Sequence, residues 1–200
     1  MKLRLAIVVC CLMLAITAFA SAQMQFSADT IIKSPKMGQS LGKMYFGGTK
    51  MRMDTTQGGH SSIMIVDLPR KMAAVLMPEQ RMYMEMDYAA YSRQMPDVRA
   101  YDPAHPCNLE PGVTCRKIGT EMVNGRMCDK WAFTGGSSGK RTVWIDQRNH
   151  LPIRTLTADG TLIEFTNVKE GPQPASLFQI PPGYRKMDMG GMMQGMPASR

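Results

Sequence analysis

EMVNGRMC, residues 121–128, contains the clearest fold signal in the chain. Asn124 and Gly125 stand between two segments in which apolar and polar residues alternate. Asn-Gly is a strong signal for a two-residue β-hairpin turn, because both residues accept the positive φ angles that this turn requires. Such a turn places Val123 opposite Arg126. The stretch therefore predicts an antiparallel hairpin.

The same pattern extends on both sides of this hairpin. Alternating segments separated by Gly, Pro or Asn turns run from residue 25 to residue 87 and from residue 115 to residue 169. Short alternating runs joined by tight turns are typical of an antiparallel sheet. We expect about ten strands and one or two short helices, in a mainly β fold with a single strongly curved antiparallel sheet. The pattern alone leaves open whether that sheet closes into a barrel.

The alternation stops at residues 88–95, YAAYSRQM, where we expect a helix of about two turns. A proline-rich excursion follows at residues 96–112. Near the end of the domain, Leu177, Phe178 and Ile180 are expected to dock on the sheet. The two prolines that follow them are expected to stop further strand pairing.

The N-terminus indicates export. Lys2 and Arg4 precede an almost entirely apolar run from Leu5 to Phe19, and Ala20-Ser21-Ala22 supplies the small residues of a cleavage site. This is the pattern of a secretory signal peptide. We expect a signal peptide at residues 1–22, one β-sheet domain at residues 23–186 and a flexible Met- and Gly-rich tail at residues 187–200. The location is then the periplasm or the extracellular medium.

Three cysteines remain after cleavage, and an oxidising compartment permits one disulfide among them. In the hairpin register, Cys128 lies opposite Glu121 and Cys115 opposite Thr134. Cys115 and Cys128 are then roughly 20 Å apart along the strands, whereas a disulfide tolerates about 7 Å between Cα atoms. We therefore favour Cys107–Cys115, which closes a short loop with a Pro-Gly turn. A bulge or bend in the strand would allow Cys115–Cys128 instead.

The third cysteine has two readings. Lys130 lies two residues from Cys128 on the same strand face, and a nearby cation lowers the pKa of a thiol. A small, half-buried core cysteine is the simpler role.

Five phrases, taken in order, carry a family resemblance: GKMYFGGTKMRMD, VLMPEQRMYMEM, GTEMVNGRMCDKW, VWIDQRNHLPIR and LFQIPPGYRKM. Together they resemble an uncharacterised family of bacterial exported proteins related to the LolA-like group, which includes the periplasmic carrier of outer-membrane lipoproteins. The resemblance covers roughly residues 26–187. It implies an open, unclosed β-barrel with helices in its mouth and a hydrophobic cavity, which holds acyl chains in the carriers. It transfers no catalytic motif.

Charge and motifs disfavour several classes of function. Without residues 1–22 the chain has 22 basic and 16 acidic residues, spread without a basic run between aromatics, so we expect no nucleic-acid partner. The mild positive field allows peripheral contact with anionic headgroups, although a solvated surface explains it more simply. GGSSG at residues 135–139 precedes a strand rather than the helix that a nucleophile elbow needs. We expect a monomer that is not an enzyme.

Methionine is the unusual residue, with 21 in the chain. In RMYMEMDY, residues 81–88, alternate positions are methionines that share one strand face. Flexible, polarizable thioethers suit an adaptable apolar wall, and soft Cu(I) also prefers them. We favour the wall. The candidate residues for hydrophobic ligand binding are Met51, Met53, Met82, Met84 and Met86.

The tail supports a different hypothesis, because it has no core to fill. Its methionines are a candidate Cu(I) site, with a disordered tail of biased composition as the simpler explanation. These residues are Met187, Met189, Met192, Met193 and Met196.

Three functions follow from these patterns. The first is a periplasmic binding or carrier protein that takes a lipid or lipoprotein acyl chain into a cavity lined by methionine and aliphatic side chains, with no cofactor. The second is a Cu(I)-binding protein that uses the tail. The third is an envelope-stress or partner-binding scaffold on the same fold.

Overall fold

The computed structural model describes residues 24–89, 107, 112–136 and 139–187. The predicted signal peptide lies outside this part of the chain. So do the 88–95 helix beyond Ala89, almost all of the proline-rich excursion, and the tail beyond Met187.

The described residues form a single 12-stranded sheet. The strands are β1 (Gln25–Ser34), β2 (Gly38–Gly47), β3 (Lys50–Gln57), β4 (His60–Asp67), β5 (Met72–Met77), β6 (Met82–Asp87), β7 (Thr114–Val123), β8 (Arg126–Thr134), β9 (Arg141–Asp146), β10 (Pro152–Thr157), β11 (Leu162–Glu170) and β12 (Arg185–Lys186). One 3₁₀ helix, η1 (Ala175–Phe178), precedes β12.

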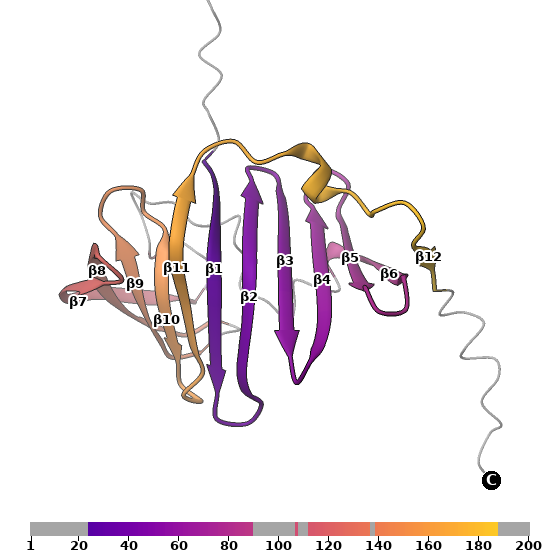
Figure 1. The fold of residues 1–200 in the computed structure, drawn as a ribbon. Helices are drawn as coiled ribbons and strands as arrows, with labels where there is room; N and C mark the ends of the chain where they lie inside the picture. Colours follow the sequence, from indigo (N-terminus) through magenta and orange to yellow (C-terminus); the bar gives the residue numbers. More distant parts are fainter. Residues whose placement is uncertain (1–23, 90–106, 108–111, 137–138, 188–200) are drawn as a thin grey trace, which may run out of the picture.

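The sheet is open. Its order is β12-β6-β5-β4-β3-β2-β1-β11-β10-β9-β8-β7, so β12 and β7 are the outer strands. Figure 1 shows the sheet curving, with β7–β9 at the left turned steeply away from the direction of the upright strands β1–β4. The mainly β fold with one strongly curved, unclosed antiparallel sheet is thus confirmed, with twelve strands rather than about ten.

The Asn124-Gly125 turn forms as the sequence predicts. Both residues have positive φ, at 49° and 76°, and Val123 lies opposite Arg126. Farther from the turn the register differs from the expectation, because the pairing shifts between Lys117 and Gly119. An extra residue in one strand of a pair displaces everything beyond it by one position.

The displaced register corrects one predicted pair. Cys115 lies opposite Phe133 rather than Thr134, whose partner is Thr114. Cys115 is joined to Cys107, with 5.2 Å between their Cα atoms, which is the pairing favoured from the sequence.

The prediction that strand pairing ends at Pro181-Pro182 is wrong. β12 follows these prolines and pairs in parallel with β6, with Arg185 opposite Met82. The Arg185 N–H donates to the Arg81 carbonyl at 2.9 Å. Proline removes only its own N–H from a ladder, so the residues after it remain free to pair.

The C-terminal segment covers one face of the first half of the sheet. In Figure 1 this segment runs past the upper ends of the upright strands, with η1 at the upper end of β4, before it reaches β12. Phe178 is buried, and a Cβ at Gly47 would lie 2.7 Å from its ring. Ile180 and Tyr184 pack against the cluster of Ile65, Ala74 and Leu76. The predicted docking of Phe178 and Ile180 is confirmed. Within the described residues, no helix is long and apolar enough to cross a membrane.

Candidate functional site

The opposite face of β2–β6 carries rows of methionines, because directly paired residues of neighbouring strands share a face. One row runs Met44, Met53, Met64, Val75, Met84 from β2 to β6. The next row runs Phe46, Met51, Val66, Ala73, Met86, and Met82 pairs with Met77. We call this surface the methionine face.

The structure therefore brings the five candidate methionines onto one face, although they come from β3 and β6. Met51 is buried with 8% of its surface exposed. Met53, Met82, Met84 and Met86 are half-buried. Met51 belongs to the largest core cluster, and Met53 and Met86 pack against it. The face is thus part core and part accessible surface.

Sequence reasoning missed two methionines of the first row. Met44 and Met64 lie directly opposite Met53 on its two sides. Each stands alone in its own strand, in LGKMYF and SSIMIVD, so no local methionine pattern marks it. The positions of the turns between β2, β3 and β4 set the register, and counting outward from them would have found both residues.

The metal hypothesis rests on residues that are mostly outside the described chain. Of the five tail methionines only Met187 is described; its N–H donates to the Tyr83 carbonyl at 2.8 Å. In the part of the chain that the structure describes, no group of three or more His, Cys, Asp or Glu side chains is arranged to hold a metal ion.

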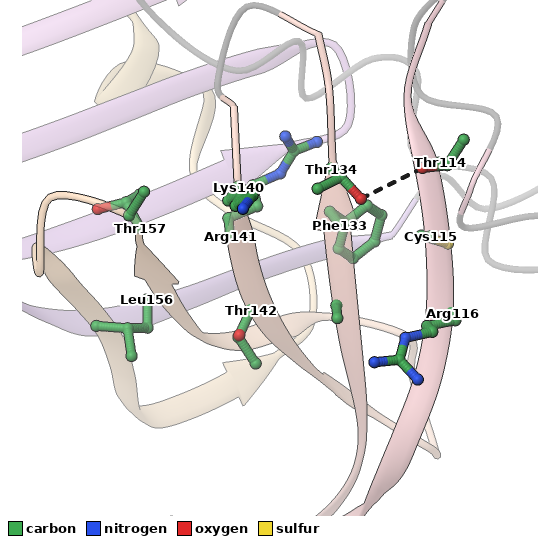
Figure 2. A pocket seen from close by; sticks show the side chains of 12 residues that line it. Thr114, Cys115, Arg116, Phe133, Thr134, Lys140, Arg141, Thr142, Leu156 and Thr157 are labelled. Carbon is green, nitrogen blue, oxygen red and sulfur yellow. Dashed lines mark hydrogen bonds between the residues drawn. The ribbon is translucent and has the colours of Figure 1, made fainter.

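A second candidate site is a cavity of about 550 Å³ at the other end of the sheet. It is formed by the residues around the end of β8 and the start of β9, and none of the candidate methionines lines it. The lining residues are Thr114, Cys115, Arg116, Ala132, Phe133, Thr134, Lys140, Arg141, Thr142, Leu156, Thr157 and Ala158. Figure 2 shows Arg116 extending from β7 in the direction of Thr142 on β9.

Beside this cavity lies a network of charges around Trp144. The Glu121 carboxylate accepts hydrogen bonds from the Trp144 indole N–H at 2.8 Å and from Lys130 at 3.2 Å. These hydrogen bonds lower the pKa of Glu121. Arg154 pairs with Glu164 at 2.7 Å and lies 3.6 Å from Glu121. The cations and carboxylates of this network neutralise one another.

Cys128 lies at the buried end of the same strands. Its thiol is fully buried, and burial, followed by the nearby Asp146 carboxylate, raises its pKa to about 11. Asp146 is itself fully buried and forms an ion pair with Arg126. The environment of Cys128 is that of a core cysteine, and a thiolate activated by Lys130 is the wrong reading.

The family model described as a domain of unknown function, DUF4412, matches residues 29–149, more than half of the chain. The chain belongs to the DUF4412 family. The prediction of an uncharacterised family is confirmed. No curated protein matches the chain in sequence.

Solved structures share the fold of this DUF4412 chain. An uncharacterised conserved protein from Thermus thermophilus is similar with a TM-score of 0.59 and 11% identity, over 82% of this chain and 90% of that one. MucB of Pseudomonas aeruginosa, in complex with MucA, is similar with a TM-score of 0.50 and 15% identity, over 80% of this chain. The match spans only 56% of that MucB-complex chain. A LolA superfamily protein from Nitrosomonas europaea has 10% identity over 80% of this chain and 91% of that one, with a TM-score of 0.33, too low to carry an argument.

Proposed function

We propose that this chain is an exported, non-enzymatic binding protein that accepts a lipid acyl chain or a similar hydrophobic group on the methionine face. The observation that carries the proposal is the row from Met44 to Met84, in which four of five paired positions are methionines. Thioether chains have three rotatable bonds and adapt to irregular apolar shapes. They bind without transferring protons, so the proposed role is binding rather than catalysis.

Partial burial supports this role. A fully packed core has no room for a ligand, whereas Met53, Met64 and Met84 are only half-buried. Covering them with a hydrocarbon chain gains roughly 0.8 kcal/mol for each CH₂ group removed from water. The Cys107–Cys115 disulfide supports export, because such bonds persist in oxidising compartments.

The test is native mass spectrometry of gently purified protein, together with titration of a fluorescent fatty acid. We expect a co-purifying lipid mass and saturable uptake. Met53→Glu places a charge on the methionine face and is expected to weaken uptake by at least about tenfold, since burying an unpaired charge is costly. Met37→Glu is the matched control, because Met37 is 68% exposed. A clean apo mass without fatty-acid uptake would refute the proposal.

A protein partner is the second candidate. The outer strand β7 exposes Ile118 and Met122, and Met127 is exposed beside them on β8. Exposed apolar groups on an edge strand favour pairing with another chain, and the MucB neighbour is known in complex with MucA. If a partner binds here, Met122→Lys combined with Met127→Lys abolishes its cross-linking to the chain. Cross-linking that survives these substitutions contradicts the idea.

The tail hypothesis is a separate proposal. If the methionines after Lys186 capture Cu(I), the full chain binds Cu(I) more tightly than a chain that ends at Lys186. Equal affinities in a competitive Cu(I) titration would remove the tail from consideration.

A further inference from the structure

The cavity near β7–β10 lies on the face opposite the methionine face. Arg116, Ala132, Thr142 and Leu156 are directly paired across β7, β8, β9 and β10. Leu156 in turn pairs with Leu162, which pairs with Lys33 of β1. In β1 Lys33 is five positions from Ala28, the partner of Met44, so the two point to opposite faces. The cavity is thus separate from the proposed hydrocarbon site.

The lining of the cavity has an excess of positive charge. Two of its lining residues are the cations Arg116 and Lys140, and none of the described lining residues is a carboxylate. Among the described residues, no carboxylate forms an ion pair with Arg116 or Lys140. The nearby cations differ, since Lys130 and Arg154 are neutralised by Glu121 and Glu164. Positive charge without a matching carboxylate attracts an anion from solution.

Among the described residues, the carboxylate of Asp159 follows the lining residue Ala158 and is already engaged in hydrogen bonds. Asp159 accepts hydrogen bonds from the amide and hydroxyl of Thr161, both at 3.1 Å, and also from the hydroxyl of Thr157. The oxygens of this carboxylate are therefore occupied by hydrogen-bond donors of its own turn.

The remaining lining groups suit an oxyanion. Thr114 and Thr134 share a hydrogen bond of 3.3 Å between their hydroxyls, drawn in Figure 2. Thr142 adds a third hydroxyl on β9. Guanidinium forks and hydroxyls are the donors that match phosphate geometry.

We propose that this cavity binds a phosphate-bearing ligand through Arg116, Lys140 and the threonine hydroxyls. Its volume of about 550 Å³ exceeds what a lone phosphate ion needs and lies within the range of small-molecule sites. Leu156, which is 38% exposed, and Ala132 supply an apolar wall for the rest of the ligand. The ligand class is a phosphate ester, either free or as the headgroup of a lipid.

The experiment measures binding of inorganic phosphate by calorimetry and binding of vesicles by flotation, with phosphatidylglycerol or phosphatidylcholine as the lipid. Arg116→Gln combined with Lys140→Gln removes two charges from the cavity. Lys36→Gln combined with Arg70→Gln removes two exposed charges elsewhere and is the matched control. Thr142→Val tests a hydroxyl without changing the charge.

We expect the cavity variant to weaken phosphate binding by at least about tenfold, because charge-assisted hydrogen bonds are lost. The control should stay within about twofold. Thr142→Val should weaken binding by less than the charge variant.

If the protein binds inorganic phosphate but does not float with either type of vesicle, the ligand is a free phosphate ester. Binding to phosphatidylglycerol but not phosphatidylcholine vesicles that depends on Arg116 and Lys140 indicates a lipid headgroup. Both results support the site. If neither probe binds, or if the cavity variant and the control lose affinity equally, the site does not exist. Fatty-acid uptake at the methionine face is read independently, so either proposal can fail alone.

Discussion

The two ends of the sheet differ in the side chains that they present: one end is mainly apolar and the other carries ion pairs. Across β2–β6 the methionine face consists of flexible apolar side chains that contact one another without hydrogen bonds. Across β7–β9 the side chains act in pairs: Glu121 with Trp144 and Lys130, and Asp146 with Arg126. A thioether that is replaced leaves a neighbour that can adjust, whereas an ion that is replaced leaves its partner unsatisfied. The methionine end should therefore tolerate side-chain changes that the charged end does not.

The largest difference is expected from Asp146→Ala. The Asp146 carboxylate is fully buried, pairs with Arg126 and accepts the Arg148 N–H at 3.2 Å. Removing it leaves the Arg126 charge without its buried partner, which costs about 3 kcal/mol of unfolding free energy. Urea denaturation measures the loss.

The matched change at the other end is Met53→Leu, a substitution that nearly conserves volume. We expect it to cost less than about 1.5 kcal/mol. If Met53→Leu destabilises the protein as much as Asp146→Ala, the contrast between the two ends is wrong.

Substitutions that crowd the backbone should have the opposite effect, with the larger loss of stability at the methionine end. A Cβ at Gly42 of β2 would lie 2.3 Å from the Asp54 carbonyl oxygen and 2.8 Å from the Thr30 hydroxyl. A Cβ at Gly119 of β7 would meet nothing within 4 Å. We expect Gly42→Ala to cost roughly 1–3 kcal/mol through overpacking. Gly119→Ala should change stability by less than about 1 kcal/mol.

Thermal denaturation of the two alanine variants checks this prediction. Equal losses would show that the spacing of β2 and β3 relaxes around the new methyl group. The expected result would show that the methionine end tolerates changes of its side chains but not crowding of its backbone.

The charged end should also respond to acid. Hydrogen bonds from Trp144 and Lys130 lower the pKa of Glu121 in the folded protein. A carboxylate with a depressed folded pKa contributes stability above its unfolded pKa and loses that contribution as the pH falls through the folded value. We therefore expect the fluorescence of Trp144 to change below about pH 4.5.

A Trp131→Phe background isolates the signal of Trp144, because the chain has two tryptophans. Adding Glu121→Gln should remove the acid-dependent change while Trp144 stays buried. An identical titration in both proteins would show that another group causes the change.

Local sequence patterns were sufficient where a turn fixes its own strands. The Asn124-Gly125 signal gave the correct turn because two residues with positive φ determine it. The shift at Lys117–Gly119 escaped prediction, since a bulge depends on how β7 lies against β8 and leaves no required residue type. β12 escaped for a related reason, because its parallel partner β6 lies about a hundred residues earlier in the chain.

The two candidate sites also differ in whether local sequence is enough to predict them. The alternation within RMYMEM places three methionines on one face by local geometry alone. The cavity was not predicted, because Arg116, Thr142 and Leu156 come from three strands and none of them stands in a motif. Only the pairing of β7 to β10 brings them together.

The smallest effect is expected at Cys128, where we predict almost no reaction. Its pKa of about 11 lies two units above the usual 9.0, and only the thiolate attacks a disulfide reagent. In a chain that begins at Gln23 with the Cys107–Cys115 bond intact, labelling at pH 8 should be on the order of 100-fold slower in the native state than in urea. Cys128→Ala gives the background rate. Native labelling as fast as that of the unfolded chain would show that water reaches the charged end of the sheet. The ion pair of Asp146 would then be solvated, and its removal would cost far less than about 3 kcal/mol.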